Sequence, residues 1–279
     1  MAIDRTNWYL GKKKYNVLVL GLAYEGISIP ILWTWLDKAG NATGKEHLDI
    51  VKRFVKLFGK DCIEGILGDR EFANKTLFQG LSEIQVPFYI RIKEGTQLRI
   101  KSGKFCKAKR LFNHLNTKEK GSFGMSVWIS EVKVYLAGSR SERGELMIVA
   151  SLKADKAAIS KYLRRWEIEN LFSALKSKGF RLEETHIQKQ DRLEKLMALL
   201  AVALAWAHKV GEWQAIKKPI PFNHHKNSLY NSRRPQYTYF RYGLDFIRDC
   251  LIHFQEKSSA FLECLMQLIL PITTLSETA

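Results

Sequence analysis

The stretch "YLRRWEIENLFSALK", residues 162–176, carries polar side chains at a spacing that could handle a phosphodiester. If it is helical, at about 100° per residue, four side chains fall in one stripe about 60° wide. They are Tyr162, Arg165, Glu169 and Lys176. Most of the apolar residues lie roughly opposite, so we expect a polar face backed by a packed one. A carboxylate among cations could hold a metal ion beside DNA phosphates. By geometry alone, a solvated face with a weak Arg165–Glu169 ion pair is the favoured interpretation.

Two aspartates shift the interpretation from a solvated helix face toward a metal-binding site, because each ends a hydrophobic strand. Asp4 ends "MAID", which we expect to be a strand fragment, and Asp69 ends "CIEGILGD", residues 62–69. Ligands of open α/β sheets bind outside the carboxyl ends of the strands. If the two strands are neighbours, a helix packed at that edge can bring Glu169 to both aspartates. Three gathered carboxylates require divalent cations, and oxygen ligands suit Mg²⁺ or Mn²⁺.

The residues match a known signature. Tyr162, Arg165, Glu169 and Lys176 reproduce the spacing Y-x2-R-x3-E-x6-K, and the chain therefore resembles the DDE transposases of bacterial insertion sequences. The segment "AIDRTNW" (2–8) is similar to that family's first aspartate motif, and "GDREF" (68–72) to its second. The resemblance covers essentially the whole chain, with the motifs in the family's order.

This resemblance implies a ribonuclease-H-like α/β core with a β-rich insertion before the glutamate-bearing helix, followed by a helical C-terminal region. It implies that Asp4, Asp69 and Glu169 are catalytic and hold Mg²⁺ or Mn²⁺, as two ions. It also implies that Tyr162, Arg165 and Lys176 contact DNA phosphates. Trp128 is the tryptophan of the insertion and the candidate to stack on a flipped base. A place in the core of the insertion sheet is the favoured alternative for Trp128.

The order of expected elements divides the chain at residues 93 and 152 into three parts. Residues 1–93 read as the first part of the core, with a hairpin over 15–36 and a helix that starts at a Thr43/Glu46 capping box. Residues 94–152 read as short strands, "AKRLF" (108–112) among them. Residues 153–279 begin with one long helix from Asp155 to about Lys178, and a second helix covers roughly 189–212.

Composition favours a polyanionic partner. The chain of 279 residues has a formal charge of +17, and residues 91–120 hold ten Lys and Arg against two Glu. The basic loop 217–243, which includes Arg233 and Arg234, is suited to DNA contact. Four scattered cysteines indicate neither a disulfide framework nor a zinc site. The longest apolar run, residues 196–207, is too short for a membrane span and predicts a buried core helix. We expect a bacterial cytoplasmic protein associated with the nucleoid, with no membrane segment.

Three functions remain open. The first is the catalytic region of an insertion-sequence transposase, which cuts DNA and joins 3′-hydroxyls to a target as a homodimer on DNA. Because Asp4 is the fourth residue, we expect an N-terminal truncation, a shortened first strand and an Asp4 near a fraying end. The second is a non-catalytic DNA-binding or inhibitory remnant. The third, ranked last, is a host nuclease or resolvase of the ribonuclease-H type.

Overall fold

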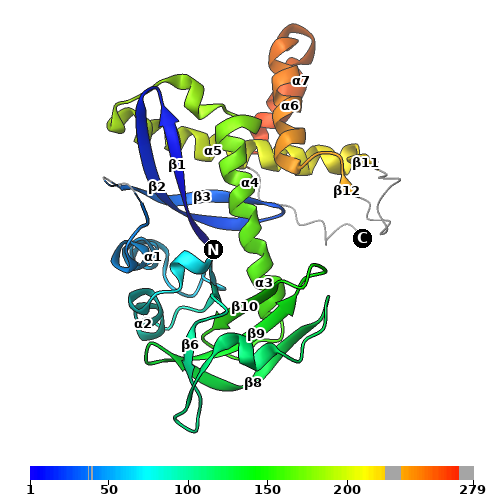
Figure 1. The fold of residues 1–279 in the computed structure, drawn as a ribbon. Helices are drawn as coiled ribbons and strands as arrows, with labels where there is room; N and C mark the ends of the chain where they lie inside the picture. Colours follow the sequence, from blue (N-terminus) through cyan, green and yellow to red (C-terminus); the bar gives the residue numbers. More distant parts are fainter. Residues whose placement is uncertain (37, 39, 224–233, 270–279) are drawn as a thin grey trace. The chain divides into compact units, whose positions relative to one another are not determined.

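The computed structural model describes residues 1–36, 38, 40–223 and 234–269 (Figure 1). The chain forms two compact units, Met1–Phe172 and Ser173–Ala279. Each unit is described by itself below.

The first unit is built on one mixed sheet of ten strands in the order β3-β2-β1-β4-β5-β10-β9-β8-β6-β7. Strand β1 pairs in parallel with β4, and β4 in parallel with β5, whereas the remaining pairs are antiparallel. The strands are β1 (Ala2–Leu10), β2 (Lys13–Tyr24), β3 (Ile27–Leu36), β4 (Ile66–Gly68), β5 (Phe88–Ile92), β6 (Gln97–Arg99), β7 (Phe105–Lys107), β8 (Lys120–Ile129), β9 (Val132–Arg140) and β10 (Leu146–Ser151).

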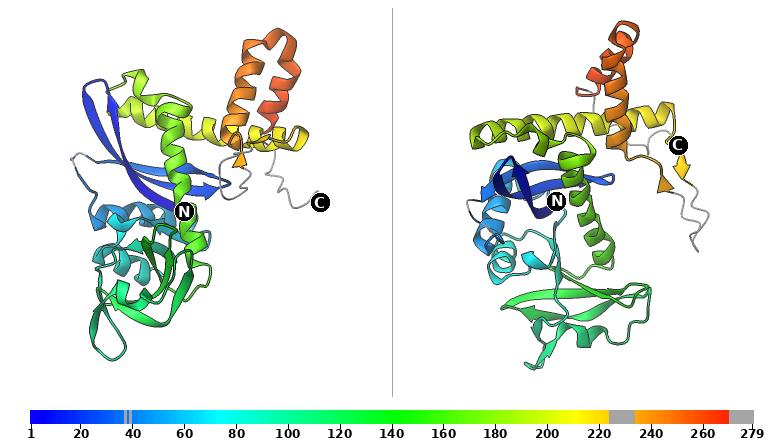
Figure 2. Two further views of the ribbon diagram at one scale, coloured as in Figure 1. Left: turned by 45° about the vertical axis from the view of Figure 1, so that its right-hand side comes forward. Right: turned by 45° about the horizontal axis from the view of Figure 1, so that its top comes forward.

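The core lies on the face of the sheet that α1 (Gly44–Phe58) and α2 (Lys75–Glu83) cover, as the views in Figure 2 show. The capping box is confirmed: Thr43 accepts from the backbone of Glu46, and the Glu46 side chain accepts from the backbone of Thr43. Buried side chains from both helices and from the strands form one continuous cluster. Strand β10 pairs with β5, so the strands of residues 94–152 extend the same sheet.

The expectation of a shortened first strand was wrong. Strand β1 has nine residues and continues through Asp4 to Leu10, where Gly11 adopts a positive φ and the chain turns into β2. Every residue of β1 pairs with β2, and the Leu67 amide donates to the Met1 carbonyl. Asp4 therefore lies within a paired central strand and is not at a fraying end.

The segment "AKRLF" is a 3₁₀ turn, η2 (Ala108–Phe112), and not a strand. Ala108 and Phe112 are fully buried while Arg110 between them is exposed, a pattern that fits a helical turn, because a strand would place all three side chains on one face. Phe112 packs against Gly138, where a side chain would collide with its ring. The turn therefore packs on the core face of the sheet, over strands β8, β9 and β10.

The helix expected after Asp155 is not uniform. Helix α3 (Ala158–Leu163) passes into the 3₁₀ turn η3 (Arg164–Trp166) and then into α4 (Glu167–Ser173). A π-helical segment, η4 (Ala174–Lys178), follows and ends at Gly179 as expected. The 3₁₀ turn η3 has fewer residues per turn than an α-helix. The assumed rotation of about 100° per residue therefore does not hold between Tyr162 and Glu169.

The second unit is helical. It contains η5 (Leu182–Thr185), α5 (Gln190–Lys217), α6 (Tyr239–Ile252), α7 (Phe254–Met266) and two short paired strands, β11 (Phe222–Asn223) and β12 (Arg234–Pro235). The apolar run in α5 is buried on one side only: Met197 and Leu204 are buried, whereas Leu199 is 68% and Val202 59% exposed. The prediction of a fully buried helix was therefore wrong. None of the described helices is long and apolar enough to cross a membrane.

Two glycines set the contact between α5 and α6. A side chain on Gly211 would collide with the Tyr239 carbonyl, and one on Gly243 with the Ala207 carbonyl. The two backbones therefore touch where the helices cross, and no other residue permits that approach.

Gly243→Ala should lower the free energy of unfolding by about 1–3 kcal/mol, since the added methyl group forces the helices apart. Gly95→Ala in an open turn of the first unit is the control for substitution as such, because a side chain there meets no other atom within 4 Å. Urea denaturation, followed by circular dichroism and tryptophan fluorescence, measures the difference in free energy of unfolding. An unchanged midpoint for Gly243→Ala would show that the crossing tolerates separation.

Candidate active site

The pairing of β1 with β4 brings the two motif aspartates together. Ala2 lies opposite Leu67, and two further residues along each parallel strand lead to Asp4 and Asp69. Asp69 directly follows β4 and accepts a hydrogen bond from the Arg70 amide at 2.7 Å, capping the 3₁₀ turn η1 (Arg70–Phe72). Asp4 accepts from the Arg5 amide at 2.7 Å. The two carboxylates are close enough for the charge of Asp69 to raise the pKa of Asp4.

The Arg165 guanidinium joins Asp4 to the glutamate of the helix. Its Nη2 donates to Glu169 Oε1 at 2.8 Å, and its Nη1 donates to Asp4 Oδ2 at 3.4 Å. The Arg165 side chain is only 10% exposed, and its Nε is buried without a partner in the described part of the chain. A cation is therefore held between two of the three candidate carboxylates, in a place largely closed to water.

The first two residues of the stripe are buried, whereas the Glu169 side chain is 41% exposed and Lys176 is half-buried, so the solvated-face interpretation does not hold for Tyr162 and Arg165. Tyr162 and Arg165 are buried, while Leu163 and Trp166 are 50% and 62% exposed. The carboxylates of the strands make this inward orientation favourable, because a buried guanidinium needs charged partners. The Tyr162 ring lies 5.9 Å from the Arg165 guanidinium, and burial raises the pKa of the Tyr162 hydroxyl.

The environment of Asp4 disfavours its charge. Burial raises the pKa of Asp4 to about 6; the Arg5 amide and the Arg165 guanidinium oppose this, and the charges of Glu71 and Asp69 add to it. A carboxylate placed this way is stabilised by any additional nearby positive charge.

A second network beside Asp4 was missed at the sequence level. The Arg5 guanidinium contacts Glu71 at 3.6 Å, Asn16 at 3.2 Å and Asn41 at 3.0 Å. The contact with Glu71 ties β1 to η1. The repeated Asp-Arg pair, in "IDR" and "GDRE", is the signal that could have identified Arg5.

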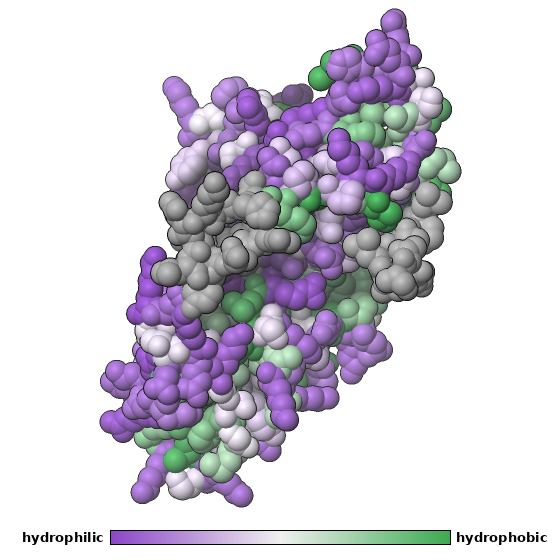
Figure 3. Space-filling view, turned by 90° about the vertical axis from the view of Figure 1, so that its right-hand side faces the viewer, coloured by the Kyte–Doolittle hydropathy of each residue, from purple (hydrophilic) through white to green (hydrophobic). Residues whose placement is uncertain are grey.

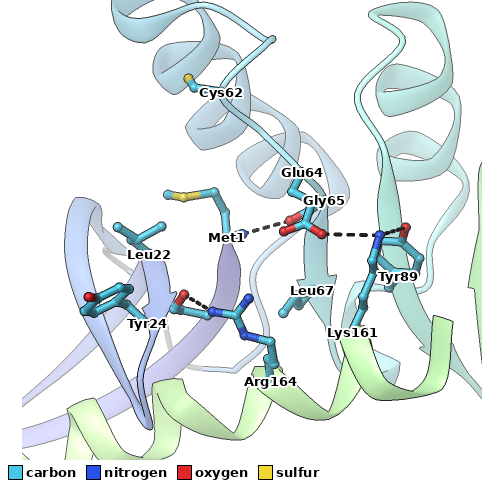
Figure 4. Close-up of a pocket in the computed structure, with 11 residues that line it drawn as sticks. Met1, Leu22, Tyr24, Cys62, Glu64, Gly65, Leu67, Tyr89, Lys161 and Arg164 are labelled. Atoms are coloured by element: carbon cyan, nitrogen blue, oxygen red, sulfur yellow. Dashed lines mark hydrogen bonds and ion pairs between the residues drawn. The ribbon is translucent and has the colours of Figure 1, made fainter. Parts of the chain in front are cut away.

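The helix that carries Arg165 is anchored on the neighbouring strands (Figure 4). Lys161 contacts Glu64 at 3.3 Å, as Figure 4 shows. It also contacts Asp155 at 3.1 Å, and the Tyr89 hydroxyl donates to Asp155 at 2.5 Å. One turn on, Arg164 donates to the Ala23 carbonyl at 2.6 Å. These contacts surround a pocket of about 250 Å³ at the start of β1 and β4. The charged groups around the pocket are already bonded to one another or to the backbone, and these contacts hold the helix that carries Arg165 in place.

The remaining predicted residues lie elsewhere. Lys176 is half-buried in the η4 segment of the second unit. Trp128 lies in β8 with the Arg99 guanidinium 5.0 Å above its ring. Arg234 belongs to β12, and Arg233 lies outside the described residues. Their roles stay predictions.

A hard divalent cation suits the donor set, since three carboxylates from β1, η1 and α4 supply only oxygen ligands. The position of Arg165 shows that positive charge is stabilised between Asp4 and Glu169. Within the described ranges, however, no three Asp, Glu, His or Cys side chains are gathered closely enough to hold a metal ion together. The carboxylates therefore fit such an ion chemically, while a guanidinium occupies the space between two of them.

The raised pKa of Asp4 predicts a specific pH dependence. The folded protein binds the Asp4 proton up to about pH 6, whereas the ordinary value is 3.8, so this group's contribution to stability falls as the pH rises from about 4 to 6. The loss amounts to at most about 3 kcal/mol. Asp4→Asn removes this pH-dependent loss. In urea denaturation with EDTA present, the free energy of unfolding of the variant relative to the wild type should therefore be higher at pH 7.5 than at pH 5. An equal difference at both pH values would contradict the assignment.

Arg165→Met should lower the free energy of unfolding in EDTA by about 3 kcal/mol, because it leaves Asp4 buried without its cation. Arg164→Met is the matched control. It should cost about 1 kcal/mol, since Arg164 is half-exposed and is held by a backbone carbonyl and Glu167. Adding Asp4→Asn to Arg165→Met should recover part of the loss. Equal effects of the two arginine variants would rule out a special role for the bridge.

Most residues visible on the face of the molecule in Figure 3 are hydrophilic, in keeping with the charge of +17.

A search of curated proteins found no match. Among solved structures, the chain is similar to a piggyBac transposase in a synaptic complex with hairpin DNA, with 12% identity and a TM-score of 0.41. That match covers 62% of this chain and 39% of the other. The family model of the transposase DDE domain matches residues 1–206, and the chain therefore belongs to the DDE transposase family.

Proposed function

We propose that this chain cuts DNA strands and joins 3′-hydroxyls to target DNA, as the catalytic region of an insertion-sequence transposase. The observation that carries the proposal is the assembly at β1 and β4. Asp4 and Asp69 lie in register on parallel strands, and Arg165 links Asp4 to Glu169. Family membership supports the same class of reaction.

We also propose a ribonuclease-H-like core, with residues 94–152 inserted before the glutamate-bearing helix. Its support is the strand order β3-β2-β1-β4-β5, in which β1, β4 and β5 are parallel and β2 is antiparallel between its neighbours. The inserted strands then continue the sheet from β5 through β10. In this proposal residues 1–93 and 153–279 supply the two parts of the core and the C-terminal helices.

Asp4, Asp69 and Glu169 are proposed to hold Mg²⁺ or Mn²⁺, as two ions. Such ions would activate a water or a 3′-hydroxyl and stabilise the leaving oxygen during in-line displacement at phosphorus. In the joining step, the oxygen of the 3′-hydroxyl forms a bond to the target phosphorus. One phosphorus–oxygen bond of the target strand breaks, and its leaving oxygen takes up a proton.

The chain's own cations complete the proposed mechanism. While Arg165 lies between Asp4 and Glu169, it neutralises their charge. When its carboxylates bind other cations, the guanidinium becomes free to pair with a phosphate of the DNA, which a planar fork of donors does well. The Tyr162 ring, 5.9 Å from the guanidinium, adds a cation–π contact that supports Arg165 in this position. Lys176 is proposed as a further phosphate contact.

DNA is the proposed partner, and two copies of the chain are proposed to act together on the element ends. The excess of positive charge supports a DNA partner. The pairing of two chains is carried over from the resemblance to insertion-sequence transposases.

A second candidate is a protein that binds DNA without cutting it. The observation that favours it is the absence, among the described residues, of a three-ligand cluster. If Arg165 stayed in place with DNA bound, its positive charge would disfavour a metal ion between Asp4 and Glu169.

A nicking assay on DNA carrying the element ends, with and without Mn²⁺, tests the proposal. Glu169→Gln should slow metal-dependent nicking at least about 100-fold, because it removes a metal ligand. Glu167→Gln, two residues away and paired with Arg164, should retain most of the activity. Equal loss in both variants would remove the case for Glu169. DNA binding by the wild type without nicking would favour the second candidate.

A further inference from the structure

Four side chains form a row across four neighbouring strands. Lys133 of β9 lies opposite Trp128 of β8, Trp128 lies opposite Arg99 of β6, and Arg99 lies opposite Phe105 of β7. Directly opposed residues of paired strands point to the same face of a sheet. Cations and aromatic rings therefore alternate along one line, which we call the cation–aromatic row.

The row lies on the solvent face of the sheet. The neighbouring residues Leu98, Val127 and Val134 are fully buried on the other face. Phe105 is 71% exposed, and Arg99 and Lys133 are exposed as well. The Arg99 guanidinium covers the Trp128 ring at 5.0 Å, so Phe105 is the aromatic ring of the row that stays open.

The hairpin that carries Phe105 is strongly basic. Residues 97–110 contain six Lys and Arg and no Asp or Glu: Arg99, Lys101, Lys104, Lys107, Lys109 and Arg110. In the described part of the chain, none of these six forms an ion pair with a carboxylate. Their charge is therefore available to an external anion. Cations can also protect an edge strand such as β7 from pairing with other chains, but that purpose does not require an exposed phenylalanine among them.

The row shares its face of the sheet with the helix of the candidate active site. Tyr135 is two residues from Lys133 and so points the same way, and it lies opposite Ser151, which lies opposite Tyr89. The Tyr89 hydroxyl contacts Asp155 at the start of that helix. Arg91, also on this face, is close enough to Tyr162 to influence its pKa. A DNA strand at the carboxylates could thus continue along the same face.

We propose that the cation–aromatic row and the basic hairpin form a binding surface for single-stranded DNA, with Phe105 stacking on an unpaired base. The lysines contact phosphates on either side of that base. A positive groove with exposed rings is how proteins bind single strands with little sequence preference. The inference rests on the proposed function, because the strand it binds is an unpaired stretch of the DNA that the carboxylates cut.

Fluorescence anisotropy of a labelled oligothymidine strand and of a labelled duplex, with the full chain and EDTA, tests the surface. Phe105→Ala should weaken single-strand binding about tenfold and leave duplex binding nearly unchanged. Phe105→Trp should restore it. Lys101→Gln with Lys104→Gln should reduce the slope of log affinity against log salt by about 0.7 for each lost phosphate contact.

Matched controls come from α1, which covers the opposite face of the sheet. Phe58 is 57% exposed there, and Phe58→Ala, or Lys52→Gln with Lys56→Gln, should not change single-strand affinity. Melting temperatures close to the wild type establish that Phe105→Ala folds. Wild-type affinity in Phe105→Ala would overturn the proposal, as would an equal loss in Phe58→Ala. Self-association of the lysine variants with unchanged DNA affinity would also overturn the proposal. It would show that the lysines prevent the edge strand β7 from pairing with other chains.

Failure of this surface and failure of the proposed function give different results. Metal-dependent nicking lost in Glu169→Gln, together with unchanged binding in Phe105→Ala, would retain the enzyme and reject the surface. Weakened single-strand binding in Phe105→Ala, with no nicking under any condition, would retain the surface and reject the enzyme.

Discussion

The organisation of the first unit depends on one guanidinium held between two carboxylates. Asp4 lies in a central strand where burial raises its pKa to about 6, and the Arg165 cation beside it offsets part of that cost. A buried guanidinium must be held in place, because an unpaired charge at this depth would be expensive. The contacts of Lys161 with Asp155 and of Arg164 with the Ala23 carbonyl keep the helix where Arg165 can reach both Asp4 and Glu169.

The same arrangement relates stability to the proposed activity. In the proposed mechanism Asp4, Asp69 and Glu169 accept divalent cations, and three such acidic groups would repel one another in the free protein. Arg165 supplies a positive charge within the chain, and in this proposal its long side chain moves away when another cation binds. The 3₁₀ turn Arg164–Trp166 contributes, because within it Arg165 is buried while Trp166 is exposed. A uniform helix would place these side chains differently.

The ten-stranded sheet supports two surfaces with one backbone. One face is packed by α1, α2 and the η2 turn, and it holds the apolar core. The other face carries the helix of the candidate site and, farther along, the row of Lys133, Trp128, Arg99 and Phe105. Because side chains alternate between faces, the registry that buries Val127 and Val134 also exposes their polar and aromatic neighbours. A single registry thus sets both the core and the proposed DNA surface.

The sequence by itself determined the features that depend on near neighbours: the capping box of α1, the hairpin at Glu25-Gly26, the strand before Asp69 and the motif spacings that identify the family. Tertiary structure decided which partner each face meets. Asp4 became an interior residue of β1 because β2 and β4 pair on both sides of that strand. Arg165 is buried because Asp4 and Glu169 bind its guanidinium, and Trp128 is covered because strand pairing places Arg99 beside it. The periodicity of the sequence predicts which residues share a face of a helix or strand. Which charge or ring lies against that face depends on contacts between segments far apart in the sequence.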